Sequence, residues 1–98
     1  MKRILFLLLI ITNLVNAQNV DSLFVNANNL YKAGKFEDAI KEYEIIESKK
    51  LVSLELYYNL GNSYYKLNKV GPAIYYYEKA LNIDSSNEDV RNNLVFAK

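Results

Sequence analysis

The chain has 98 residues, enough for one small domain, and its 12 basic and 11 acidic side chains give a formal net charge of +1. Its lysines are scattered among acids, which excludes the basic stripe that nucleic-acid binding needs. Histidine and cysteine are both absent, so the sequence offers neither the usual proton shuttle nor a thiolate, and we expect no enzyme, no cofactor and no metal site.

The segment 1–17 has the three parts of a secretory signal peptide. Two basic residues follow the initiating methionine, residues 4–11 are an unbroken apolar run, and the small side chain of Ala17 ends the segment. This run is shorter than the roughly 20 residues that a membrane-spanning helix needs. We therefore predict that residues 1–17 are an export signal cleaved after Ala17, with an uncleaved N-terminal anchor as the alternative.

The rest of the chain, 18–98, contains an internal repeat whose offset superimposes Ala39 on Ala73. We divide this domain into a first repeat at 20–53, a second repeat at 54–87 and a terminal helix at 88–98. The identical pairs at this offset include Asn28 and Asn62, Tyr31 and Tyr65, Lys32 and Lys66, Ile40 and Ile74, and Tyr43 and Tyr77.

The first copy divides into two amphipathic segments. Apolar residues recur at helical spacing from Leu23 to Tyr31, and then Gly34 interrupts the pattern. A second apolar face runs from Phe36 to Ile46. The pattern predicts a helix, a turn and a second helix.

The second copy repeats this arrangement with clearer boundary signals. Ser53 is a predicted N-cap, and an inner stripe runs from Tyr57 to Leu67. Residues 68–71 are the predicted turn. Pro72 then falls in the first turn of the next helix, where its missing N–H costs nothing.

Polar residues at 84–87 break the pattern again and predict the start of a fifth helix. Ser86 followed by Asp89 resembles an acidic N-cap arrangement. The new helix would turn Val90 and Leu94 inward. The predicted fold class is therefore all-α, with five helices and no strand.

The second copy resembles the tetratricopeptide repeat family. This resemblance implies helix-turn-helix repeats stacked as a short right-handed superhelix, with two repeats and a capping or truncated fifth helix. It also implies that three tyrosines of the signature, at 57, 64 and 77, pack in the core. The residues at signature positions are Tyr57, Leu60, Gly61, Tyr64, Ala73, Tyr77 and Ala80.

A narrower resemblance covers residues 71–98, GPAIYYYEKALNIDSSNEDVRNNLVFAK. This segment is similar to the N-terminal part of the exported tetratricopeptide member of the Bat (Bacteroides aerotolerance) proteins. The likeness implies a cell-envelope complex in the periplasm or on the outer face of the inner membrane of a Gram-negative bacterium. In that group more chain often follows, so we expect a shortened relative or a longer protein.

The family resemblance implies that the first helix of each pair lines a concave side that binds a protein or peptide segment. Each asparagine there could both donate and accept a hydrogen bond with a peptide backbone. The tyrosines at 58 and 65 also fit ordinary exposed aromatic residues, and the lysines also fit a solvated face. The predicted partner-binding residues are Phe24, Asn28, Tyr31, Lys32, Tyr58, Asn62, Tyr65, Lys66 and Asn92, with Phe96 beyond them.

Two alternatives remain open at the level of sequence. The first is a protein-interaction scaffold that docks a partner segment. Tyr75 and Tyr76 lie on a helix that has one face against the next helix and the other toward solvent, or they mark a contact site. The other is a structural assembly module that self-associates or completes its superhelix with another chain, because two repeats are fewer than the roughly three that usually form a stable array. Phe24 and Tyr58 stand where carboxylate-clamp subfamilies have lysine, so no such clamp is expected.

Overall fold

The computed structural model describes residues 21–98, so the predicted signal peptide at 1–17 lies outside the described residues. The described part is all-α, as predicted, and it contains no strand. None of its helices is long and apolar enough to cross a membrane. The helices are residues 21–32, α2 (Phe36–Ser48), α3 (Leu54–Lys66), α4 (Val70–Ile83) and α5 (Glu88–Ala97).

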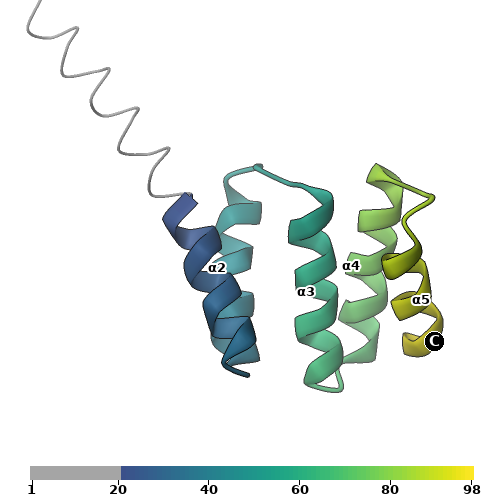
Figure 1. Ribbon diagram of the computed structural model, residues 1–98, viewed down its shortest axis with the longest axis horizontal. Helices are drawn as coiled ribbons and strands as arrows, with labels where there is room; N and C mark the ends of the chain where they lie inside the picture. Colours follow the sequence, from purple (N-terminus) through teal and green to yellow (C-terminus); the bar gives the residue numbers. More distant parts are fainter. Residues whose placement is uncertain (1–20) are drawn as a thin grey trace, which may run out of the picture.

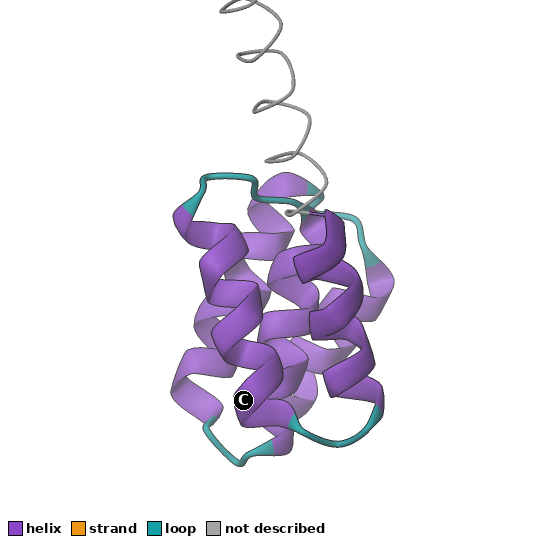
Figure 2. Cartoon of the chain, turned by 90° about the vertical axis from the view of Figure 1, so that its left-hand side faces the viewer, coloured by secondary structure: helices purple, strands orange, loops and turns teal. Residues whose placement is uncertain are grey.

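The helices follow one another in alternating directions and form two helix-turn-helix pairs, to which α5 is added (Figure 1). In the described part α3 packs against α2 and α4, and α5 packs against α4 and, more lightly, α3. Figure 2, turned by 90°, shows the connecting loops gathered at the two ends of the helices. The first helix of each pair and α5 therefore run in the same direction, which aligns equivalent residues of successive repeats.

The turn between the two helices of the second repeat is shorter than predicted. We expected the turn to occupy residues 68–71, but α4 already begins at Val70. Asn68 adopts a left-handed conformation with φ of 60°, and the Lys69 N–H bonds the Tyr64 carbonyl at 2.9 Å. One left-handed residue is enough to end a helix and reverse the chain, so Gly71 lies within α4.

The same type of turn closes the first helix, where Gly34 has φ of 80°. There the Lys35 N–H bonds the Leu30 carbonyl at 2.9 Å. Gly34 and Asn68 occupy equivalent positions in the two copies, so the repeat preserves a backbone conformation as well as side-chain types.

The starts of α3 and α5 give one confirmed cap and one correction. The Leu56 N–H donates to the Ser53 hydroxyl at 3.1 Å, as the predicted N-cap requires. At α5 the cap is Asn87, whose Oδ1 accepts from the Val90 N–H at 3.0 Å, so the prediction of Ser86 was wrong. The Ser86 hydroxyl donates instead to Asp84 at 2.7 Å.

Two of the three signature tyrosines are buried in the core, and the third lies at its edge. Tyr57 and Tyr77 are buried, and Tyr77 is only 1% exposed. Tyr64 is half-buried, and its hydroxyl donates to Glu44 at 2.6 Å. Tyr77 lies flat against Gly61, where any side chain would meet its ring. The small residue expected where two helices cross closely is thus a packing requirement.

Three buried residues of the second repeat were not predicted as core. Leu56 and Ser63 are completely buried in α3, and Ser63 satisfies its hydroxyl by donating to the Asn59 carbonyl at 2.7 Å. Tyr76 is buried as well, because its ring stacks between those of Tyr57 and Tyr64, with centroid distances of 6.0 and 5.7 Å. Tyr76 is therefore a packing residue.

Candidate functional site

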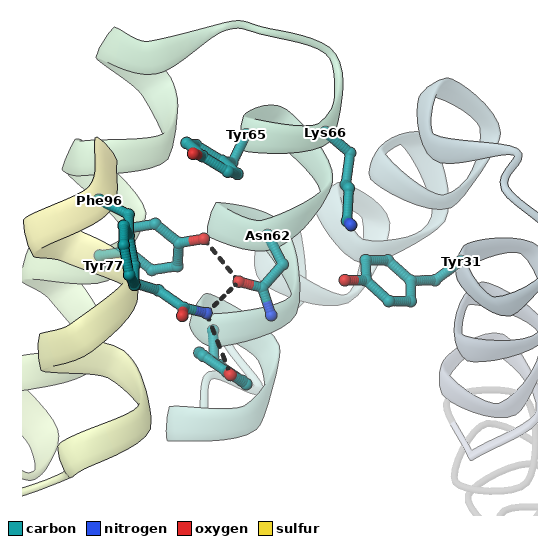
Figure 3. Close-up of a pocket in the computed structure, with 8 residues that line it drawn as sticks. Tyr31, Asn62, Tyr65, Lys66, Tyr77 and Phe96 are labelled. Atoms are coloured by element: carbon teal, nitrogen blue, oxygen red, sulfur yellow. Dashed lines mark hydrogen bonds between the residues drawn. The ribbon is translucent and has the colours of Figure 1, made fainter. Parts of the chain in front are cut away.

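A pocket of about 310 Å³ opens on the side of the molecule formed by the first helices of the pairs (Figure 3). Its lining comes from the helix at 21–32, from α3, from α4 and from α5, so it spans both repeats and the terminal helix. Aromatic rings and amide groups make up most of the lining. The lining residues are Tyr31, Tyr58, Asn62, Tyr65, Lys66, Tyr77, Asn93 and Phe96.

Five of the nine predicted partner-binding residues line this pocket, and all of them come from the first helix of a repeat. They are Tyr31, Tyr58, Asn62, Tyr65 and Lys66.

The other four, Phe24, Asn28, Lys32 and Asn92, lie outside the pocket. On α5 the structure brings Asn93 to the pocket, whereas Asn92 is exposed. Neighbouring side chains on a helix point in directions about 100° apart, so only one of these two asparagines points toward α3.

A three-residue hydrogen-bond link forms the floor of the pocket. The Tyr77 hydroxyl donates to Oδ1 of Asn62 at 2.5 Å, and Nδ2 of Asn93 donates to the same oxygen at 2.9 Å (Figure 3). Nδ2 of Asn93 also lies 3.1 Å from the Tyr58 hydroxyl. These bonds tie α3 to α4 and to α5 at a single point.

The first repeat contains the same link at the equivalent positions. The Tyr43 hydroxyl donates to Oδ1 of Asn28 at 2.5 Å, and Nδ2 of Asn59 donates to that oxygen at 3.1 Å. We call each of these sets a Tyr–Asn–Asn link. Because the links superimpose at the repeat offset, α5 docks on α3 as α3 docks on the helix at 21–32.

The link fixes how each central asparagine faces the pocket side. Both Asn28 and Asn62 have a carbonyl oxygen that already accepts two hydrogen bonds, which uses both of its lone pairs. Only the Nδ2 group of each remains to bind a ligand. The prediction that these side chains supply a donor and an acceptor is therefore corrected: each supplies a donor.

The aromatic residues of this face divide into packing and exposed groups. Phe24 meets Tyr43 edge-on at 6.0 Å, and Tyr58 meets Tyr77 at 6.4 Å, so these half-buried rings partly serve the core. Tyr65 is exposed, and Phe96 is 75% exposed. Exposed aromatic rings beside amide donors are common at binding surfaces.

The polar groups that line the pocket include several hydrogen-bond donors. Burial raises the pKa of the Tyr77 hydroxyl, and burial with the nearby Tyr58 raises the pKa of Tyr31. Both hydroxyls therefore stay protonated at neutral pH. Lys66 is the single charged residue of the lining, which contains no carboxylate. A ligand rich in acceptors complements these groups.

Sequence reasoning missed Asn59 and Asn93, the outer members of the two links. Each matches the other at the repeat offset, so an alignment extended into the terminal helix would have paired them. Their role was hidden because a hydrogen bond between helices depends on how far apart those helices pack.

Three acidic residues of α2 lie outside the pocket and accept hydrogen bonds from tyrosines or an asparagine. Glu44 and Glu47 accept from the hydroxyls of Tyr64 and Tyr76, at 2.6 and 3.0 Å. Glu42 accepts from Asn26 at 2.7 Å. In the described residues no group of His, Cys, Asp or Glu side chains could hold a metal ion. Through their hydrogen bonds Glu42, Glu44 and Glu47 join α2 to the helix at 21–32, to α3 and to α4.

Comparison with known families assigns a class to the second repeat. The family model described as tetratricopeptide repeat matches residues 54–87, about one third of the chain. The match supports the tetratricopeptide repeat family, whose domains generally bind protein or peptide partners. Comparison with curated proteins finds no significant match. The fold and this match together define an all-α helical repeat of the kind that serves as an interaction scaffold.

Proposed function

We propose that this chain is an exported scaffold whose concave face docks a segment of a partner protein. The pocket shared by three helices of the same direction is the observation that carries this proposal. It presents exposed rings together with the Asn62 amide donor, and the equivalent donor of Asn28 lies outside the pocket on the first helix of the other repeat. Repeat proteins bind partners on such extended concave surfaces. The tetratricopeptide match at 54–87 adds the family precedent.

The hydrogen-bonding groups favour an extended partner segment. Asn28 and Asn62 each have an amide N–H group left for a ligand, and backbone carbonyls of an extended chain are acceptors without a partner of their own. Tyr65 and Phe96 add exposed rings on which an apolar side chain of the same segment would pack.

The proposed location rests on the sequence. The charged start, short apolar run and Ala17 at the end of residues 1–17 support export to the periplasm or to the outer face of the inner membrane. The similarity of residues 71–98 to the exported Bat member supports a place in a membrane-associated envelope complex. A fusion of the full chain to a reporter that is active only after export tests the location.

Site-specific photo-crosslinking tests the docking face. A photoreactive residue at Tyr65 should capture a partner, whereas the same residue at Tyr75, which is 52% exposed and lies outside the pocket, should not. Replacing Phe96 with serine should reduce capture at position 65 without changing the helical content. Equal capture from both positions, or capture insensitive to Phe96→Ser, would contradict the concave-face proposal.

A second function is favoured by the apolar surface of α5. Val95 and Phe96 are 72% and 75% exposed, and Val25 is 60% exposed on the helix at the opposite end. Exposed apolar side chains at both ends of a repeat stack suit assembly of several copies. Sedimentation over a wide concentration range tests this: association that Val95→Ser abolishes supports assembly, and a monomer at all concentrations excludes it.

A further inference from the structure

Charged residues mark the two ends of the helix at 21–32 along one line of its surface. Asn28 and Lys32 follow Asp21 at spacings close to two and three helical turns, so all three side chains point within about 20° of the same direction. The acid therefore lies near the start of the helix, the asparagine in the middle and the lysine at the end, over about 16 Å at a rise of about 1.5 Å per residue.

The same line recurs on α3 and begins again on α5. Glu55, Asn62 and Lys66 occupy the equivalent positions of the second repeat, and Asp89 stands at the position equivalent to Glu55 on the terminal helix. Glu55 and Asp89 are in the first turns of their helices, and Lys66 is in the last turn of α3.

These helices share one direction (Figure 1), so the acids line one side of the concave face and the lysines the other. We call Asp21, Glu55 and Asp89 the acidic edge, and Lys32 and Lys66 the basic edge. All five side chains are exposed.

The helix dipole explains only part of this arrangement. Acids near a helix start and bases near its end are favoured on any face. The dipole does not require them to align with the asparagine of a Tyr–Asn–Asn link. The alignment places the donors of Asn28 and Asn62 between two rows of opposite charge.

We propose that the occupant of this face is an extended segment in which basic and acidic side chains alternate. This inference rests on the proposed docking function and names the chemistry of the partner. In an extended chain successive side chains point to opposite sides. Alternating charges therefore place all bases toward the acidic edge and all acids toward the basic edge, while backbone carbonyls face the Nδ2 groups of Asn28 and Asn62.

Other partner charges are disfavoured by one edge or the other. A uniformly basic segment is attracted by the acidic edge and repelled by Lys32 and Lys66. A uniformly acidic segment or a nucleic acid is attracted by the basic edge and repelled by the acidic edge. A neutral segment gains nothing from either edge. Only an alternating segment satisfies both edges at once, and each exposed pair contributes roughly 0.2–1 kcal/mol, which decreases with salt.

The test uses the purified full chain and two peptides of identical composition. One is an acetylated, amidated peptide of alternating lysine and glutamate, about eight residues long, because an extended chain advances about 3.3 Å per residue and must cross three helices about 9 Å apart. The other carries its lysines in one block and its glutamates in another. The readout is the NMR signal of the Asn62 side-chain amide.

We expect the alternating peptide to shift this signal at a concentration about tenfold lower than the block peptide. The preference should weaken as salt is added, because screening reduces interactions between exposed charges. Equal affinity for the two peptides, or no binding of the alternating one, would overturn the inference. Capture at Tyr65 of a partner segment without alternating charge would overturn it too, while leaving the docking function standing.

Charge reversal provides a sharper second test. Lys32→Glu with Lys66→Glu makes both edges acidic and should weaken binding of the alternating peptide about tenfold. Reversing the acidic edge as well, to lysine, restores two opposite edges, and the peptide fits again after a shift of one residue. Restoration to within about threefold is expected, and its failure contradicts the edge arrangement.

Two controls protect this test from effects on folding. Lys41→Glu with Glu78→Lys exchanges exposed charges on α2 and α4, the second helices of the pairs, and should leave binding unchanged. Lys32→Gln with Lys66→Gln removes the basic edge without adding repulsion and should give an intermediate loss. The helical content of each variant is compared with that of the parent chain before binding is measured.

Discussion

Gly61 and Gly71 lie on facing helices of the second repeat and should respond differently to the same substitution. A Cβ at Gly61 would lie 2.6 Å from both Cδ1 and Cε1 of Tyr77, whereas a Cβ at Gly71 meets nothing within 4 Å. Carbon atoms in contact normally lie about 3.5–4.0 Å apart. Gly61→Ala therefore requires the tyrosine ring to move by about 1 Å, whereas a Cβ at Gly71 meets no such ring and is restricted by the Pro72 that follows it.

The ring of Tyr77 has little freedom to move. It is 1% exposed, and its hydroxyl is held by Asn62 at 2.5 Å. Overpacking of this kind costs roughly 1–3 kcal/mol, and we expect the upper part of the range because two ring atoms are contacted. Alanine regains about 1 kcal/mol of helix propensity. The net expectation is a loss of about 2 kcal/mol for Gly61→Ala, against little change for Gly71→Ala, because the restriction that Pro72 places on the residue before it offsets the entropic gain.

Urea unfolding followed by circular dichroism measures both changes. In a domain of this size a change of about 1 kcal/mol moves the melting temperature by about 4–8 °C, so thermal scans should separate the two variants by about 8–16 °C. An osmolyte that favours folded states keeps the weaker variant measurable. A Gly61→Ala chain as stable as the Gly71→Ala chain would refute the packing argument.

A double substitution identifies the ring as the cause. In a Tyr77→Leu background the planar ring is gone, so Gly61→Ala should no longer destabilise the chain, although Tyr77→Leu is itself costly. The two substitutions should therefore be non-additive by about 1–3 kcal/mol. Tyr77→Phe keeps the ring and serves as the matched control, in which the cost of alanine persists.

Three further predictions concern titration, backbone conformation and the terminal helix. Burial raises the pKa of Tyr43 and of Tyr64 from 10.0 to about 12. The free energy of unfolding should therefore hold steady below pH 10 and fall as the pH rises toward 12, as measured by urea unfolding alongside tyrosinate absorbance. A free energy of unfolding that does not change between about pH 10 and 12 would contradict the burial of these tyrosines. Lys50 has φ of 60°, so Lys50→Gly should raise the free energy of unfolding in urea by up to about 1 kcal/mol, and a decrease would show that no strain is stored there. Asn93→Ala should lower the free energy of unfolding by about 1 kcal/mol and speed hydrogen exchange throughout α5. The same substitution at the exposed Asn92 should do neither. Equal exchange rates in the two variants would show that the Tyr–Asn–Asn link does not hold this helix.

The order of the helices and several of their boundaries could be predicted from the sequence. The repeat offset, Ser53 as a cap and Pro72 in a first turn are local signals, and they depend on residue type and spacing alone. The same reasoning predicted Tyr57 and Tyr77 as core residues. Such signals succeed because helical periodicity converts position in the sequence directly into direction.

The errors occur where two neighbouring residues could serve equally well. Ser86 and Asn87 are both capable caps, and only the chain's path out of α4 selects Asn87. Asn92 and Asn93 are chemically identical, and the rotation of α5 decides which one reaches Asn62. α4 is apolar on several faces, so periodicity alone did not indicate that Tyr76 lies on the face that packs.

The two Tyr–Asn–Asn links also bear on how the chain unfolds. Each joins one repeat to the next, and in a linear array the coupling between neighbours determines whether the array unfolds as a unit or from its ends. Asn28 and Asn62 also supply the donors of the proposed docking face, so a partner that binds them would strengthen this coupling. Ligand occupancy should then convert gradual loss of the terminal helix into a single cooperative transition.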